Sequence, residues 1–231
     1  MAEHGIATTS PNRVVKTEQG SEGRNALRTV LLVCGIAAPL LYVAMLVFVP
    51  LGWPEYRSAS QTISELSAIG APTRPLWVPL GIAYTLLLAA FGWGIWATTR
   101  GHRPLRIAGG LLIAYGLFGL GWPPMHLRGT EFTLTDTLHI AWTIVSLLLM
   151  LVAMVLAAAR LGTRFRVYTI VTIALFVVCG GLTFGEAPGV AANLSTPLIG
   201  VWERINAAAS QLWLIVFAGT LLRRPSVGRL P

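Results

Sequence analysis

The sequence predicts an all-α membrane protein, a bundle of six transmembrane helices with both the N and the C terminus in the cytoplasm. The first observation is composition: 55% of the 231 residues are hydrophobic and only 11% are charged, whereas soluble domains carry about 25% charged residues. The second is a set of six apolar runs, each near the roughly 20 residues that a helix needs to cross hydrocarbon. The third is the uneven placement of the basic residues around those runs.

The six apolar runs define the expected organisation of the chain. The first run is too long for the apolar region of a signal peptide, and no small-residue cleavage site follows it, so we expect an uncleaved transmembrane helix. Residues 1–26 are polar and show no hydrophobic periodicity, which predicts a disordered cytoplasmic tail. Residues 27–222 are expected to form one transmembrane domain, followed by a short basic cytoplasmic tail over residues 223–231. The expected helices cover residues 27–50, 76–99, 107–125, 137–159, 167–184 and 198–222.

The basic residues indicate how this bundle is oriented. Thirteen of the 17 Lys and Arg residues lie in the two terminal segments and in the connections after the second and fourth helices, and four lie on the opposite side. The positive-inside rule therefore places both termini in the cytoplasm. Six of the nine acidic residues lie at or near the other face, where the connections are longer. We expect the functional residues on that outer face.

Composition also excludes several classes of function. The formal net charge of +8 does not form a basic face, because the charges flank apolar runs, and recognition motifs for nucleic acid are absent. Cys34 and Cys179 both lie inside apolar runs, without a CxxC pair or a cysteine–histidine cluster, so the sequence supports neither a disulfide framework nor a thiolate metal site. The HExxH, GxSxG and P-loop motifs are also absent from the sequence.

A polar segment over residues 58–70 separates the first two apolar runs. Residues 58–66 of this segment are expected to form a short helix, with Ile63, Leu66 and Ile69 on one side and Ser60, Ser64 and Glu65 toward water or the mouth of the bundle. Glu65 has two interpretations. It turns inward, where an ionisable group near a membrane is usually functional, or it lies on a solvated loop helix whose serines bond to their own backbone.

A second group of polar residues surrounds the start of the fourth run. Asp136 and His139 share a helical face because they are three residues apart, and His126 ends the preceding helix. Two imidazoles and a carboxylate are the ligands of a three-residue metal site with an open position. The alternative is structural: Thr133 and Asp136 have the spacing of a capping box, and His139 then only donates a hydrogen bond.

Glu203 and Arg204 form a third group, about one turn into the last apolar run. Adjacent helical residues point in different directions, so each is expected to need another partner. Asn206 and Gln211 further along the same helix predict a polar pocket that extends inward. The expected partners are Arg128 or Arg74 for Glu203, and Glu65 or Asp136 for Arg204.

The octapeptide SQTISELS at positions 60–67 and the pentapeptide APTRP at 71–75 resemble the bacterial and archaeal membrane proteins of domain-of-unknown-function family 998. The resemblance covers roughly residues 27–222 and implies a six-span fold in a bacterial plasma membrane, without an established activity. A looser similarity is to transmembrane hydrolases of the alkaline-ceramidase and adiponectin-receptor type. It implies a zinc site in which Ser60 or Ser64, Asp136, His126 and His139 take part, with Glu203 replacing histidines that the last helix lacks.

The function expected from the sequence is an outward-facing polar pocket that binds a lipid headgroup or a small polar ligand. One alternative is a metal-dependent intramembrane hydrolase of lipid amides or esters, with zinc on His126, Asp136 and His139 and with Glu65 as the general base; the other is a small transporter. Membrane lipids are the expected partners, a homo-oligomer is left open, and nucleic acid is excluded. The expected pocket residues are Ser60, Ser64, Glu65, Arg128, Asp136, His139, Glu203 and Arg204.

Overall fold

The computed structural model describes residues 11–99 and 101–224, and this part of the chain is helical, as expected. An isolated bridge between Ile69 and His126 is the extent of the β-structure in the described residues. Two 3-10 helices, η1 (Val49–Gly52) and η2 (Ser64–Ser67), lie in the connection between the first two α-helices. The α-helices are α1 (Pro11–Phe48), α2 (Arg74–Thr98), α3 (Arg103–Leu120), α4 (Leu134–Ala158), α5 (Thr163–Ala191) and α6 (Ile199–Leu222).

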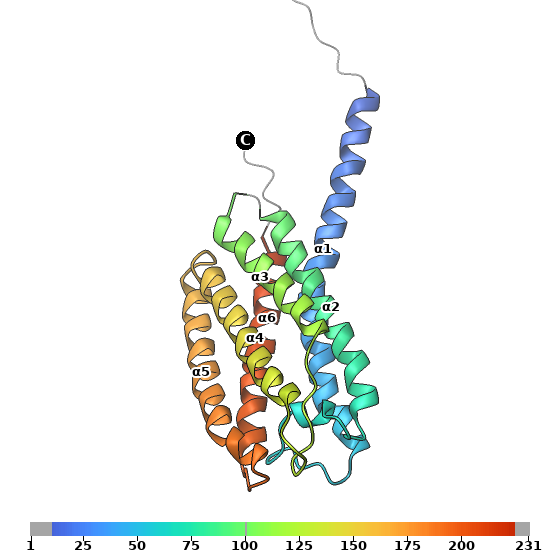
Figure 1. The fold of residues 1–231 in the computed structure, drawn as a ribbon. Helices are drawn as coiled ribbons and strands as arrows, with labels where there is room; N and C mark the ends of the chain where they lie inside the picture. Colours follow the sequence, from blue (N-terminus) through green and yellow to red (C-terminus); the bar gives the residue numbers. More distant parts are fainter. Residues whose placement is uncertain (1–10, 100, 225–231) are drawn as a thin grey trace, which may run out of the picture.

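Successive helices run in alternating directions and form a bundle (Figure 1). Neighbours in the chain pack against each other, and α1 also packs against α6, whereas α4 has little contact with α5. The three longer connections, over residues 49–73, 121–133 and 192–198, gather at one end, and the short turns after α2 and α4 lie at the other, with the end of α6 (Figure 1). The polar residues of the three long connections are thereby brought to one end of the bundle.

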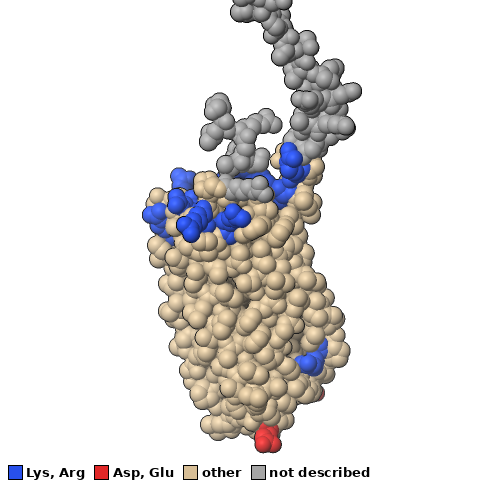
Figure 2. All heavy atoms as spheres, turned by 45° about the horizontal axis from the view of Figure 1, so that its top comes forward, with Lys and Arg blue, Asp and Glu red and all other residues tan. Residues whose placement is uncertain are grey.

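Five of the helical segments are long and apolar enough to cross a membrane: residues 22–52, α2, α4, α5 and α6. Their outer surfaces are apolar; for example, Leu40 is 58% exposed and Val178 is 59% exposed. Lys and Arg gather at the end that bears the short turns, and on the face shown in Figure 2 a broad band without charged residues separates them from the opposite end. A water-soluble protein rarely exposes so large an apolar surface. The chain is a multi-pass membrane protein.

Some helix boundaries differ from the expected ones. The third helix ends at Leu120 rather than at residue 125, because Pro123 and Pro124 cannot continue a helix. The fifth continues to Ala191, past the expected end at 184. The first begins at Pro11, within the segment expected to be a disordered tail, since each added residue extends an already nucleated helix by one hydrogen bond. The expected tails also include residues 1–10 and 225–231, which lie outside the described residues.

Helices α2 and α3 pack with their backbones in contact through glycines. A Cβ atom added at Gly109 would lie 2.7 Å from the backbone nitrogen of Trp96 and 2.8 Å from the carbonyl oxygen of Gly92. A Cβ atom added at Gly116 would lie 2.6 Å from the carbonyl oxygen of Thr85. Such small residues allow close approach of membrane helices. This contact fixes α3, and with it the start of the segment that carries His126 and Arg128.

Candidate functional site

Glu65 is fully buried and paired with Arg128. The Nε and Nη2 atoms of Arg128 donate to Oε1 and Oε2 of Glu65 at 2.8 and 2.9 Å, which is the two-pronged geometry that suits a guanidinium. This hydrogen bonding raises the pKa of Arg128 above its ordinary value. The Glu65 carboxylate also accepts from the backbone N–H of Thr62 at 2.7 Å and from Nε2 of Gln61 at 3.3 Å. Glu65 therefore turns inward, as one interpretation expected, and all of these bonds serve the loop.

Arg128 extends this network to a third connection of the chain. Its Nη1 atom donates to Oγ1 of Thr196 at 3.1 Å, and its Nη2 atom also donates to the carbonyl oxygen of Ser60 at 3.1 Å. The Thr196 hydroxyl donates to the same carbonyl at 2.9 Å. One arginine thus joins the three long connections at the end where they gather.

Glu203 and Arg204 bind the backbone of the same loop. Oε2 of Glu203 accepts from the backbone N–H of Ile63 at 2.5 Å. Arg204 donates from Nη1 to the carbonyl oxygen of Ser58 at 2.6 Å and from Nη2 to the hydroxyl of Tyr56 at 2.7 Å. Burial raises the pKa of Tyr56 to about 12, so this phenol stays neutral.

The partners expected for these two residues are therefore wrong. Arg128 pairs with Glu65, Glu203 binds a backbone amide, and Arg204 binds carbonyl oxygens and a phenol. Glu203 and Arg204 thus both hold the loop of residues 56–63 against the bundle.

Asp136 forms the capping box that the structural alternative expected. Its Oδ2 atom accepts from the backbone N–H of Thr133 at 2.9 Å and from the Thr133 hydroxyl at 2.8 Å. Its Oδ1 atom accepts from the backbone N–H of His126 at 2.7 Å, and Nδ1 of His126 lies 3.0 Å from Oδ2. Both carboxylate oxygens are therefore engaged in holding residues 126–133 to the start of α4.

These bonds bear on the zinc site that the sequence suggested. Among the described residues, no group of three or more His, Cys, Asp or Glu side chains is placed to hold a metal ion. His126 lies against Asp136, but the His139 ring is bonded to other residues. The donor set therefore does not fit a three-ligand metal site.

His139 is buried, and its two ring nitrogens face different connections of the chain. Nε2 lies 3.2 Å from the hydroxyl oxygen of Ser64 on η2. Nδ1 lies 2.8 Å from the carbonyl oxygen of Pro123 and 3.0 Å from Nε1 of Trp122. The pairing of Ser64 with His139 joins residues that are 75 positions apart, and nothing in the sequence indicated it.

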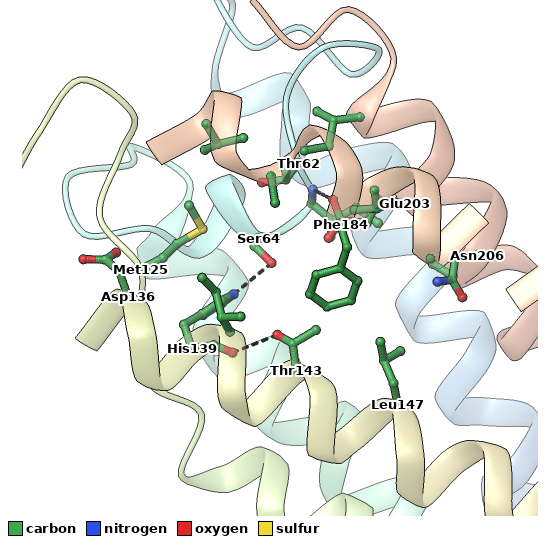
Figure 3. A pocket seen from close by; sticks show the side chains of 18 of the residues that line it. Thr62, Ser64, Met125, Asp136, His139, Thr143, Leu147, Phe184, Glu203 and Asn206 are labelled. Carbon is green, nitrogen blue, oxygen red and sulfur yellow. Dashed lines mark hydrogen bonds between the residues drawn. The ribbon is translucent and has the colours of Figure 1, made fainter. Parts of the chain in front are cut away.

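A cavity of about 270 Å³ begins beside this pair and continues between α4, α5 and α6. Figure 3 shows Ser64, His139 and Glu203 at one part of the cavity, Leu147 and Asn206 at another, and the ring of Phe184 between them. Five of the eight expected pocket residues line the cavity, Ser64, Arg128, Asp136, His139 and Glu203, and so does His126, which was expected as a metal ligand. Ser60, Glu65 and Arg204 are not among its lining residues.

Much of the lining comes from residues that the sequence gave no reason to choose. Met150 and Phe176 contribute apolar surface, and Tyr84 contributes a phenol that accepts from Nε2 of Gln211 at 2.9 Å. Gln211 and Asn206 do line the cavity, as their position in an apolar run had predicted. The apolar lining residues resemble every other apolar residue of the spans, so the sequence contains no signal for them.

Comparisons with known proteins identify a family without a described activity. Residues 36–220 match the family model described as "Protein of unknown function (DUF998)". No curated protein and no solved structure matches the chain.

Proposed function

The chain belongs to this family of proteins of unknown function, and we propose that it is a six-span protein of the bacterial plasma membrane that binds an amphiphile in an outward-facing cavity. The proposed ligand is a membrane lipid, with its polar headgroup beside Ser64, His139 and Glu203 and an apolar chain between α4, α5 and α6. In this proposal α3 also crosses the membrane, in addition to the five helical segments that are long and apolar enough, and both termini are cytoplasmic.

The distribution of charge supports this orientation. The short turns at one end carry Arg103, Arg160 and Arg164, and a broad uncharged band follows (Figure 2). Basic residues near the ends of spans remain preferentially in the cytoplasm. The long connections, and the cavity mouth formed with them, then face outward.

The observation that carries the proposal is the amphipathic lining of the cavity. Three helices each contribute residues at helical spacing, among them His139, Thr143, Leu147 and Met150 of α4. On α4 the lining changes from His139 and Thr143 near the loop end to Leu147 and Met150 deeper in the bundle, whereas α6 adds the polar side chains of Asn206 and Gln211 at depth. The volume of the cavity, about 270 Å³, is close to the lower limit of about 300 Å³ for ligand pockets. A lipid has the same division into a polar head and an apolar chain.

The contacts between helices support a route for the apolar chain. Helices α5 and α6 pack extensively against each other, whereas α4 packs little against α5. Ile140 of α4 and Phe184 of α5 line the cavity at this weak contact and are 40% and 37% exposed. An acyl chain can therefore enter the cavity from the bilayer between α4 and α5, while the headgroup of the lipid stays at the level of the long connections.

The test is lipid retention by the purified protein. Wild type, Leu147→Trp and Leu148→Trp are purified in the same mild detergent, and bound lipids are measured by native mass spectrometry and by extraction. Leu147 lines the cavity, whereas Leu148 is 55% exposed on the outer surface of the same helix. We expect about one lipid per chain in wild type and in Leu148→Trp, and its loss in Leu147→Trp. Equal retention by all three proteins would contradict the proposal.

A further inference from the structure

We infer that Ser64 and His139 are the nucleophile and general base of an acyl-transfer site. This inference rests on the proposed binding of an amphiphile in the cavity. The Ser64 hydroxyl oxygen lies 3.2 Å from Nε2 of His139, and both side chains line the cavity. A nucleophile within hydrogen-bonding reach of a base, with the base oriented by a third group, is the general arrangement of activated serines. Here the third group is the carbonyl oxygen of Pro123.

The environment of the imidazole determines which nitrogen can act as the base. The carbonyl oxygen of Pro123 lies 2.8 Å from Nδ1 and can only accept a hydrogen bond. This contact assigns the proton to Nδ1 and leaves Nε2 with a lone pair that faces Ser64. The Pro123 carbonyl thus has the orienting role that a carboxylate has in a serine triad.

Trp122 competes for the same ring nitrogen. Its indole N–H is directed at Nδ1 at 3.0 Å, and a neutral imidazole nitrogen cannot donate and accept at once. The contact of Nδ1 with the Pro123 carbonyl, at 2.8 Å, is shorter than its contact with the Trp122 indole, at 3.0 Å. If Nδ1 were unprotonated, its lone pair would face a lone pair of this carbonyl oxygen. We therefore assign the tautomer that leaves Nε2 free, in which the Trp122 N–H finds no acceptor at Nδ1; a Trp122→Phe variant removes this unmet donor.

Other hydroxyl groups near Ser64 have different partners. Ser67, on the same 3-10 turn, donates to the carbonyl oxygen of Ser64 at 2.9 Å, and Thr62 is bonded to Glu65 at 3.1 Å. Thr143, one turn beyond His139, donates to the carbonyl oxygen of His139 at 2.9 Å. Backbone-bonded hydroxyls of this kind are common in helices and turns, whereas Ser64 is directed at an imidazole.

The substrate class follows from the position of the pair in the cavity. Ser64 and His139 line the cavity near the long connections, and Leu147 and Met150 line it deeper along α4. The carbonyl carbon of an acyl lipid would lie beside the pair if its chain occupied the deeper part. Oγ of Ser64 attacks this carbon as Nε2 of His139 takes the hydroxyl proton, the bond to the leaving oxygen breaks, and the imidazolium returns the proton to that oxygen. Water, or an acceptor alcohol, then releases the acyl group from Ser64 by the same proton transfers in reverse.

The first test uses a fluorophosphonate probe with a long alkyl chain, which forms a covalent adduct with activated serines. The detergent-purified full-length protein is incubated with the probe, and the modified residue is located by peptide mass spectrometry. We expect an adduct on Ser64 in wild type and in the matched control Ser67→Ala, and none in Ser64→Ala. A wild-type protein without an adduct on Ser64 would overturn the inference, and this outcome requires no variant to fold.

Two further variants separate a chemical role from a structural one. Removal of a general base slows a reaction by roughly 100-fold or more, so we expect at least that loss of labelling rate in His139→Gln, with a monodisperse elution profile on size exclusion. Trp122→Phe removes the competing donor and should label at least as fast as wild type. An unchanged rate in folded His139→Gln would show that the Ser64–His139 bond is structural, and loss of labelling in folded Trp122→Phe would overturn the assignment of the proton to Nδ1.

The binding measurement distinguishes this inference from the proposed function. An ether-linked phospholipid has no carbonyl carbon to attack, so its retention by the purified protein reports the cavity alone. Retention of the ether lipid without labelling of Ser64 would leave the binding function in place and remove the acyl-transfer site. Labelling of Ser64 without any lipid retention would instead show an activated serine and contradict the amphiphile site on which the substrate class depends.

Discussion

Arg128 binds both carboxylate oxygens of Glu65, at 2.8 and 2.9 Å, across 63 positions of the chain. Glu65 lies on η2 between α1 and α2, and Arg128 lies in a turn of the connection between α3 and α4. The same guanidinium bonds to Thr196 in the connection before α6. The pair thus holds the three long connections together beside the cavity, which Arg128 also lines.

Separation of this pair should destabilise the protein strongly. Arg128→Ala leaves a fully buried carboxylate without its counter-charge, a change that costs roughly 3–5 kcal/mol in other proteins. We expect a marked fall in the thermal midpoint in detergent, measured by intrinsic tryptophan fluorescence. Arg128→Lys should also be destabilised, because an ammonium group cannot make the two-pronged contact.

Arg57 is the matched control for this experiment, because it is an exposed arginine in the same connection as Glu65. Arg57→Ala should leave the thermal midpoint nearly unchanged. Equal midpoints for Arg57→Ala and Arg128→Ala would show that the Glu65–Arg128 pair contributes nothing to the folded state.

The packing of α2 on α3 gives a second prediction. Gly109→Ala places a methyl group 2.7 Å from the backbone nitrogen of Trp96, and because backbone atoms cannot rotate away, the helices must separate. Overpacking of this kind costs about 1–3 kcal/mol. At Gly110, the neighbouring residue, the nearest atom to an added Cβ is Cδ1 of Trp96 at 4.0 Å. Thermal unfolding should show a loss for Gly109→Ala and no loss for Gly110→Ala; the reverse order would refute this packing.

The sequence predicted the helical fold because the signal for a membrane helix is the hydrophobicity of a whole run. The end of α3 was misplaced because the apolar run continues through Trp122, Pro123 and Pro124, although the two prolines stop the helix. Composition alone detects the membrane region, whereas the chain leaves the helix for a local reason. The segment that follows then supplies Pro123 to orient His139 and Arg128 to bind Glu65.

The candidate site was only partly predictable. Buried ionisable residues are conspicuous in an apolar chain, which is why Glu65, Asp136 and Glu203 could be selected from the sequence. Their partners depend on how three separate connections fold together, and so Arg204, expected to pair with an acid, binds carbonyl oxygens. The contact of Ser64 with His139 likewise exists only once η2 lies against α4.

The occupied donors around α4 predict how the protein responds to metal ions. Asp136 caps its helix and binds His126, and Nδ1 and Nε2 of His139 contact Pro123 and Ser64. We therefore expect neither zinc nor a chelator to change the thermal midpoint. Asp136→Ala should lower the thermal midpoint. We expect the free energy of unfolding to fall by more than the roughly 0.5–2 kcal/mol of a lost Thr cap, because the bonds to His126 are lost as well. Stabilisation by stoichiometric zinc that disappears in His126→Ala would contradict this reading of the donors.

The proposed orientation can be tested with cysteines at the two ends of the bundle. The starting protein is the Cys34→Ala/Cys179→Ala variant, in which the two native cysteines of the chain are removed. Ser195→Cys lies in the connection before α6, and Thr163→Cys lies at the start of α5 near the basic end; both positions are exposed. In intact cells a membrane-impermeant maleimide should label position 195 and leave position 163 unlabelled until the cells are lysed. The opposite pattern would place the cavity mouth in the cytoplasm, and labelling of both positions in intact cells would show that the two ends of the bundle do not lie on opposite sides of the membrane.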